Sequence, residues 1–267
     1  MHKRILAVVM SCALAISLMA TPQLAAAVTT TVSVGTEAAL DTAIANASTT
    51  AGDSTIIQLT ASFNLTTNKT IAANKNITIE SASGGPYALT RTTTAGNQFI
   101  VNAGATLTLT NVTVNGTTST GALINITGNG ILNIDNGAII QGQNSTAGNN
   151  ATISIVSTGG TINILPGSII RNNTAVDGAV IFAQNTIAGA ININISGGEI
   201  YGNKATGGQG GVIRANVNVN INISGGTIRD NIANSVGGGM YISGNATYPS
   251  SLTMTGGTIS GNTVSNG

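Results

Sequence analysis

A segment that repeats along the chain constrains its fold more than any other feature of the sequence. INISGGEIYGN, residues 193–203, returns as INISGGTIRDN at residues 221–231 and as LTMTGGTISGN at residues 252–262. The second glycine of each pair, or the residue in its place, defines seven anchors with steps of 30, 25, 30, 31, 28 and 31 residues: Ala82, Val112, Gly137, Gly167, Gly198, Gly226 and Gly257. A period in this range indicates a solenoid, in which each repeat forms one turn and buries its apolar face against the neighbouring turns.

The residues before each anchor alternate between apolar and polar. The positions five and three before the anchor are apolar in every repeat, and the position between them is polar: Thr78, Thr108, Asn133, Asn163, Asn194, Asn222 and Thr253. Alternation with a period of two predicts a strand with one buried and one solvated face. Its return once per repeat predicts that equivalent strands of successive turns lie side by side in a parallel sheet.

Two further strands are expected in each turn. One follows the anchor, with an isoleucine two positions on that we expect to point inward: Ile139, Ile169, Ile200, Ile228 and Ile259. The other is expected over residues 179–182, 211–214 and 239–242. Three strands per turn, separated by corners rich in glycine and asparagine, predict an all-β fold, a right-handed parallel β-helix (solenoid).

Asparagine recurs five positions after the anchor. The column consists of Asn172, Asn203, Asn231 and Asn262, with Gly142 in that place one turn earlier. Asparagine tolerates the left-handed backbone of a tight corner, and its amide can stack on equivalent amides of neighbouring turns. We interpret these residues as a structural asparagine ladder that needs no ligand.

Residues 1–27 have the pattern of a signal peptide. A basic stretch at residues 2–4 precedes an uncharged apolar run over residues 5–20, and three alanines at residues 25–27 supply an A-x-A cleavage site. We therefore expect an exported protein, secreted or at the cell surface, whose mature chain begins at Val28.

Removal of residues 1–27 takes away the chain's single cysteine and single histidine, Cys12 and His2. The mature chain then lacks the side chains for disulfides, thiol or imidazole catalysis, and the usual zinc sites. We assign no catalytic residue, no metal site and no cofactor.

A helix is predicted at the start of the mature chain. In Thr36 to Ala47, TEAALDTAIANA, the apolar residues Ala39, Leu40, Ala43 and Ile44 share one face. We expect this helix to cover the open first turn of the solenoid. The predicted organisation is an amino-terminal strand and capping helix over residues 28–55, followed by β-helix repeats over residues 56–267. The carboxy-terminal end is expected to be incomplete, continuing into further repeats or an anchor.

The composition narrows the classes of partner. Charged residues make up 6% and aromatic residues 3% of the chain, whereas ordinary globular domains carry about 25% charged residues. The mature chain keeps seven basic and eight acidic residues, a net charge of about −1. This balance offers no basic patch for nucleic acid. No apolar stretch after the signal approaches the roughly 20 residues that span a membrane.

Several segments resemble known families. The helix followed by IIQLTASFNLTTNKTIAANKNITI at residues 56–79 looks like the amino-terminal entry into the pectin-lyase-like right-handed β-helix superfamily. GAVIFAQN at residues 178–185, GGVIRAN at 210–216 and GGMYISGN at 238–245 are similar to repeats of polymorphic outer-membrane proteins and adhesin-like surface proteins. The resemblance covers roughly residues 34–267. It is specific for the fold and weak for function.

The resemblance implies a chemistry that the repeat register can test. Enzymes of the superfamily cleave acidic polysaccharides with several carboxylates on one outward strand face, which bind Ca²⁺ in lyases or act as acid and base in hydrolases. Asp135, Asp177, Glu199 and Asp230 occupy four different columns of the repeat. Stacking of the turns is therefore not expected to pair them.

One charged spot is expected on the outer surface. Glu199 and Tyr201 should face outward one turn from Thr227 and Arg229, so that Arg229 lies over the Tyr201 ring or reaches Glu199. The spot is either a surface contact that stabilises the stack or a small saccharide-binding site.

The hypotheses of function differ in class. We favour an exported adhesin-like β-helix with a structural or surface-contact role and no catalysis, whose partner is a glycan or protein of a host or neighbouring cell. The candidate binding residues form the flat, neutral outward face: Thr108, Asn133, Asn163, Asn194, Asn222 and Thr253. The alternatives are a polysaccharide lyase or hydrolase of the pectin-lyase-like superfamily, and an ice-binding protein whose evenly spaced threonines order water.

Overall fold

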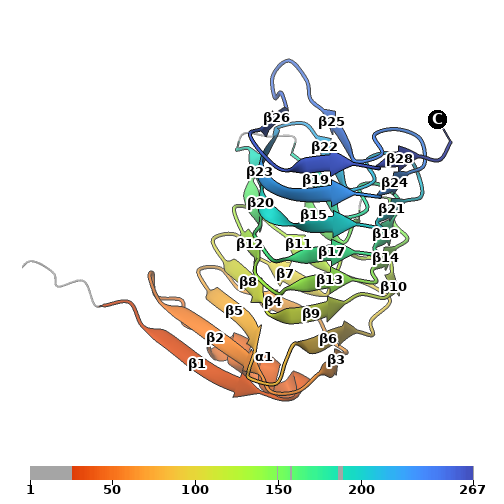
Figure 1. Ribbon diagram of the computed structural model, residues 1–267. Coiled ribbons are helices and arrows are strands. Elements are labelled where there is room, and N and C mark those ends of the chain that lie inside the picture. The colour runs from red at the N-terminus through yellow and green to blue at the C-terminus, as the bar shows by residue number, and fades with distance from the viewer. Residues whose placement is uncertain (1–25, 149, 157, 186–188, 267) are drawn as a thin grey trace, which may run out of the picture.

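The computed structural model describes residues 26–148, 150–156, 158–185 and 189–266. These residues form a right-handed parallel β-helix in which three parallel sheets run along the axis of the stack (Figure 1). Residues 1–25, which hold most of the predicted signal peptide together with His2 and Cys12, lie outside the described residues.

The largest sheet is built from two strands of each turn. Fifteen strands of the described residues belong to it. The strands before the anchors are β1 (Thr29–Val34), β2 (Ser54–Leu59), β5 (Asn76–Ser81), β8 (Thr106–Thr110), β12 (Ile131–Ile134), β16 (Gly160–Ile164), β20 (Ile191–Tyr201), β23 (Val219–Arg229) and β26 (Ser251–Met254). Those after the anchors are β3 (Phe63–Leu65), β6 (Tyr87–Arg91), β9 (Val112–Asn115), β13 (Ile139–Gln141), β17 (Ile169–Arg171) and β27 (Thr258–Ser260). Strands β20 and β23 run through both positions.

Two smaller sheets complete each turn. A six-stranded sheet comprises β10 (Thr118–Ser119), β14 (Asn144–Ser145), β18 (Thr174–Ala175), β21 (Lys204–Ala205), β24 (Ile232–Ala233) and β28 (Thr263–Val264). A seven-stranded sheet comprises β4 (Lys69–Ile71), β7 (Phe99–Val101), β11 (Ile124–Ile126), β15 (Ile153–Val156), β19 (Ile181–Gln184), β22 (Ile213–Asn216) and β25 (Met240–Ser243). The strands expected over residues 179–182, 211–214 and 239–242 thus begin one or two residues later than predicted.

The apolar columns before the anchors form the core, as the alternation predicts. Ile77, Leu107, Leu132, Ile162, Ile193 and Ile221 pair in register from turn to turn and are fully buried. Because a single turn could not enclose these side chains, their burial depends on the turns on either side. Each contributes roughly 1.5–3 kcal/mol before the conformational entropy of the chain is counted.

The predicted inward column after the anchor is wrong in two turns. Ile140 and Ile170, not Ile139 and Ile169, are fully buried and in register with Ile200. The reason is the length of the link between the two strands. Residues 165–168 connect β16 to β17, whereas residues 196–198 make the equivalent connection within β20, one residue shorter. Equivalent positions after the glycine anchor therefore lie one residue further along the chain in the earlier turns than in the later turns.

The same slip misplaces one member of the asparagine ladder. Asn172 adopts a left-handed backbone with φ of 55° at the corner, in register with Gly202, whose φ is 64°. It is Asn173 that lies below Asn203, and the side-chain oxygen of Asn203 accepts hydrogen bonds of 3.0 Å from both the backbone and the side-chain nitrogen of Asn173. The ladder member in this turn is therefore Asn173.

The ladder continues upward with the same double hydrogen bond. The side-chain oxygen of Asn231 accepts from the backbone and side-chain nitrogens of Asn203 at 3.0 and 2.9 Å, and that of Asn262 accepts from Asn231 at 3.1 and 2.8 Å. One turn below Asn173, the backbone nitrogen of Gln143 donates to the Asn173 side-chain oxygen at 3.0 Å. The ladder satisfies corner groups that strand pairing leaves without partners.

Helix α1 (Glu37–Asn46) lies across the amino-terminal end of the stack (Figure 1). The side chain of Thr36 accepts a hydrogen bond of 3.3 Å from the Ala39 amide and caps the helix. Leu40, Ala43 and Ile44 are buried and join the core. The predicted helix is thus confirmed, and it covers the core of the first turns.

Two buried lysines fasten α1 to the β-helix at both of its ends. The Lys69 ammonium lies 2.6 Å from a carboxylate oxygen of Glu37 and 2.7 Å from one of Asp41. The Lys75 ammonium donates to the carbonyl oxygens of Ile44 and Ala45, each at 2.7 Å. These carbonyls belong to the last turn of the helix, where a cation is favoured by the helix dipole.

A third buried cation stabilises a corner in the lower part of the stack. Arg91 is 1% exposed, and its guanidinium donates to carbonyl oxygens of neighbouring loops, including those of Thr93 at 2.9 Å and Ala122 at 3.0 Å. Burial lowers the pKa of Arg91 to about 10, so the group keeps its charge at neutral pH.

The attachment of α1 is expected to weaken in acid. Burial alone would raise the pKa of Glu37, but hydrogen bonds from Lys69, Thr66 and Thr67 outweigh it and lower the pKa from 4.5 to about 2. A carboxyl whose pKa is lowered by folding contributes stability above its unfolded pKa and loses it as the pH falls toward the folded value. We expect hydrogen-exchange protection of α1 to fall between pH 4.5 and 2 while that of β16 and β20 persists.

Glu37→Gln should lower the protection of α1 by about 1–3 kcal/mol at pH 7 and remove most of this pH dependence. Glu80→Gln is the matched control, because the Glu80 carboxylate accepts a hydrogen bond of 2.8 Å from Gln58 on the open sheet surface, away from the helix. Equal protection of α1 at pH 7 and pH 3 in the unsubstituted protein would contradict this account.

The asparagine ladder at the corner should contribute more to stability than the asparagines on the outward face of the large sheet. Asn203→Ala leaves buried groups of Asn173 and Asn231 without partners, and we expect it to destabilise the stack by about 2–4 kcal/mol. Asn194→Ala, on the outward face of β20, should cost less than about 1 kcal/mol. Thermal unfolding of both variants tests the difference, and similar shifts would refute the structural weight given to the ladder.

Candidate functional site

The first candidate site is the outward polar face of the large sheet. We call it the amide face and define it by the sequence-predicted residues Thr108, Asn133, Asn163, Asn194, Asn222 and Thr253. These residues pair in register across β8, β12, β16, β20, β23 and β26. The structure therefore brings all of them together in one column.

Five side chains of the amide face, from Thr108 to Asn222, are hydrogen bonded to one another along the axis. The amide nitrogen of Asn133 donates to the Thr108 hydroxyl at 3.0 Å, and that of Asn163 donates to the Asn133 oxygen at 2.7 Å. The contact repeats from Asn194 to Asn163 at 2.8 Å and from Asn222 to Asn194 at 3.0 Å. Each of these five side chains is held by at least one neighbour, so this part of the column is ordered before any partner arrives.

The side chains of the amide face retain unused hydrogen-bond donors. Each of these contacts uses one of the two hydrogens on a side-chain nitrogen, so the second hydrogen can donate to a further acceptor. A parallel row lies beside it, in which Asn220 donates to Asn192 at 3.3 Å and Ser251 donates to Asn220 at 3.0 Å. The two rows give a flat, neutral surface with donors repeated from turn to turn.

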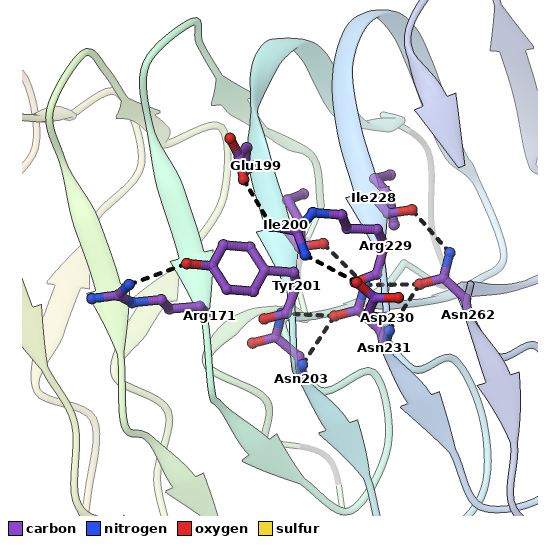
Figure 2. A network of polar contacts seen from close by, with 10 residues as sticks. All are labelled: Arg171, Glu199, Ile200, Tyr201, Asn203, Ile228, Arg229, Asp230, Asn231 and Asn262. Carbon is purple, nitrogen blue, oxygen red and sulfur yellow. Dashed lines mark hydrogen bonds and ion pairs between the residues drawn. The ribbon is translucent and has the colours of Figure 1, made fainter. Parts of the chain in front are cut away.

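The second candidate site lies on the outer side of the strands after the anchors (Figure 2). We call it the Arg–Tyr cluster: Arg171, Glu199, Tyr201, Arg229 and Asp230. The Arg229 guanidinium carbon lies 4.3 Å from the centre of the Tyr201 ring, and its NH2 nitrogen lies 3.2 Å from a Glu199 oxygen. Both contacts that the sequence predicts for Arg229 are present together.

Two members of the Arg–Tyr cluster were not found from the sequence. Asp230 pairs with Arg229 at 2.9 Å, a contact between adjacent residues that the left-handed backbone of Asp230 makes possible. Arg171 lies opposite Tyr201 in the sheet and donates to its hydroxyl at 3.1 Å. Its register was hidden by the longer link at residues 165–168.

The charges of the Arg–Tyr cluster are unevenly compensated. Arg229 donates hydrogen bonds to the carboxylates of Asp230 and Glu199, and these contacts raise the pKa of its guanidinium above its ordinary value. Arg171 instead donates to the side-chain oxygen of Gln141 at 2.9 Å and to Tyr201, and no ion pair within the described residues includes it. A shallow hollow of about 360 Å³ beside Glu199 is lined by Gly167, Ser168, Ile169, Gly198 and Thr227.

The acidic residues considered for catalysis are dispersed except at this cluster. Asp177 pairs with Arg214 at 2.5 Å on another side of the molecule, and Asp135 accepts a hydrogen bond from the Asn136 amide. Glu199 and Asp230 come together, but both pair with the single guanidinium of Arg229. Among residues 26–266, apart from the few that are not described, no three acidic, histidine or cysteine side chains cluster as metal ligands.

The chain matches no protein-family model, no curated protein and no solved structure. In the described part of the chain, no helix is long and apolar enough to cross a membrane.

Substitution at Tyr201 separates the contacts of the Arg–Tyr cluster. Tyr201→Phe keeps the ring beneath Arg229 and removes the hydroxyl that Arg171 contacts, so we expect a loss of less than about 0.5 kcal/mol. Tyr201→Leu removes the cation–π contact as well and should cost about 1 kcal/mol. Chemical denaturation measures both effects. Equal losses in the two variants would show that the ring face contributes nothing to the stability of the stack.

Proposed function

We propose that this protein is an exported, adhesin-like β-helix that acts as a rigid contact surface without catalysis. The amide face is the observation that carries the proposal. Its donors and acceptors are neutral, aligned and repeated at the roughly 4.8 Å spacing of adjacent strands. They suit a partner that presents many hydroxyl or amide groups along one direction, such as a surface glycan or an extended protein segment.

The hydrogen bonds along the amide face lower the free-energy cost of binding a partner. Binding normally costs about 0.5–1.5 kcal/mol for each flexible side chain that becomes fixed. The side chains of Asn133, Asn163 and Asn194 are already fixed by their neighbours, so this cost is reduced. Several weak contacts along one rigid surface give a higher overall affinity than one contact alone. After the first contact has formed, each further contact forms within the same complex.

The resemblance to adhesin-like repeats favours the same role. The polysaccharide lyase or hydrolase alternative needs carboxylates free to bind Ca²⁺ or to exchange protons. Glu199 and Asp230 are instead engaged by Arg229. Ice binding needs a regular threonine array, whereas the central turns of the amide face carry asparagine.

Retention of the mature protein on insoluble neutral polysaccharides, protein-coated beads and cells of the source organism tests the proposal. Asn163→Ala combined with Asn194→Ala should reduce retention at least fivefold, because two adjacent positions of the amide face are lost. Asn125→Ala combined with Gln184→Ala is the matched control, since these residues lie on the seven-stranded sheet and are partly exposed. Both pairs should keep the fold, as judged by thermal unfolding.

Other outcomes favour other functions. Equal retention of the two double variants would contradict a role for the amide face. Release of unsaturated or reducing products from polygalacturonate would support the enzyme alternative, and thermal hysteresis would support ice binding.

A further inference from the structure

Within the part of the chain that the structure describes, from residue 26 onward, Val28 is the first residue with a hydrogen bond from its backbone to the β-helix. Its carbonyl accepts a hydrogen bond of 2.9 Å from the Ser54 amide, and its nitrogen donates to a carboxylate oxygen of Asp53 at 2.9 Å. The strand β1 begins one residue later and pairs with β2 from Thr29 opposite Ser54. Ala26 and Ala27, immediately before, are exposed.

Asp53 is held in position to receive a positive charge. Its second carboxylate oxygen accepts a hydrogen bond of 2.7 Å from the Ser48 hydroxyl, and no ion pair within the described residues includes Asp53. Lys75 lines the same hollow as Asp53, but its ammonium is turned to the carbonyl oxygens of Ile44 and Ala45. The carboxylate therefore meets a neutral amide in the uncut chain.

We propose that cleavage of the Ala27–Val28 bond creates an α-ammonium group at Val28 that pairs with Asp53 and fastens β1 to the β-helix. The inference rests on the export that forms part of the proposed function. Two independent observations point to this residue: the alanines at residues 25 and 27 fit the cleavage rule for signal peptidase, and the nitrogen that cleavage would free lies 2.9 Å from a carboxylate.

The chemistry of the step is a hydrolysis by a signal peptidase with water as the second reactant. The C–N bond between Ala27 and Val28 breaks, and the hydroxyl of water forms the new carboxylate on Ala27. The Val28 nitrogen becomes an amine and takes a proton at neutral pH, since the α-amino group has a pKa of about 7.7–8.0. The existing hydrogen bond to Asp53 becomes a charge-assisted one, which is about twice as strong as a neutral bond.

The electrostatics at Asp53 agree with this assignment. The hydrogen bond from Val28 and then that from Ser48 lower the pKa of Asp53, so the carboxyl is ionised when the exported chain folds near neutral pH. A free ammonium group at the Val28 nitrogen would also lower the pKa of Asp53, because a nearby positive charge favours the ionised carboxylate.

The first test is the identity of the mature terminus. The full chain is produced in a secreting bacterial host, and the exported protein is examined by intact mass and amino-terminal sequencing. We expect it to begin at Val28. An exported protein that begins at another residue contradicts this inference alone, whereas a full-length chain retained inside the cell contradicts the export on which it rests.

The second test isolates the charge at Val28. Two proteins are prepared with defined termini, one beginning at Val28 and one at Ala26, which keeps the Val28 amide but moves the ammonium two residues away. We expect Asp53→Asn to raise the unfolding equilibrium constant about fivefold in the protein that begins at Val28. The same substitution should change it less than twofold in the protein that begins at Ala26.

The pH dependence provides a signature that a neutral hydrogen bond would not produce. Pairing with Asp53 raises the pKa of the α-amino group in the folded protein, so its contribution is complete below the unfolded value of about 8 and is lost as the pH rises through the folded value. The effect of Asp53→Asn in the protein that begins at Val28 should therefore shrink between pH 7 and pH 10. An equal effect in both proteins at every pH would overturn the pairing.

Discussion

Hydrogen bonding between successive turns is the constraint on which the rest of the structure depends. In a parallel β-helix the backbone groups of one turn find their partners only in the turns above and below, so every position must match in register. The fully buried aliphatic columns enforce this match from inside, and the ladder of Asn173, Asn203, Asn231 and Asn262 enforces it at a corner. A change in the length of one link consequently moves every residue that follows it in that turn.

The sequence was sufficient to predict the fold, because the alternation before each anchor is regular and its columns are either wholly apolar or wholly polar. It was not sufficient to place the strands after the anchor in every turn. The glycine anchors look equivalent, yet the links at residues 165–168 and 196–198 differ by one residue. Local composition does not reveal which residue of a link is extra, and so Asn172 was assigned the position that Asn173 occupies.

For the candidate sites too, the sequence predicted the contacts before the anchors better than those after them. The alignment of the amide-face residues was predicted because they lie before the anchors, where the register is constant. The contact of Arg229 with Tyr201 and Glu199 was predicted because β20 and β23 share the same short link. Arg171 was missed since it lies across the change in link length. The partners of the buried Lys69 and Lys75 were missed because no periodic pattern relates these lysines to a helix distant in the sequence.

The two kinds of polar contact in this protein respond differently to the medium around it. The hydrogen bonds of the corner ladder and of the amide face join uncharged side chains, and dissolved ions do not screen such contacts. The stiffness of the stack, and any contact made along the amide face, should therefore be nearly the same in fresh water and in brine. Charge is concentrated instead at the Arg–Tyr cluster and where α1 closes the first turn, at Glu37, Asp41 and Lys69. The length of the stack should therefore depend less on ionic strength than the attachment of α1 does.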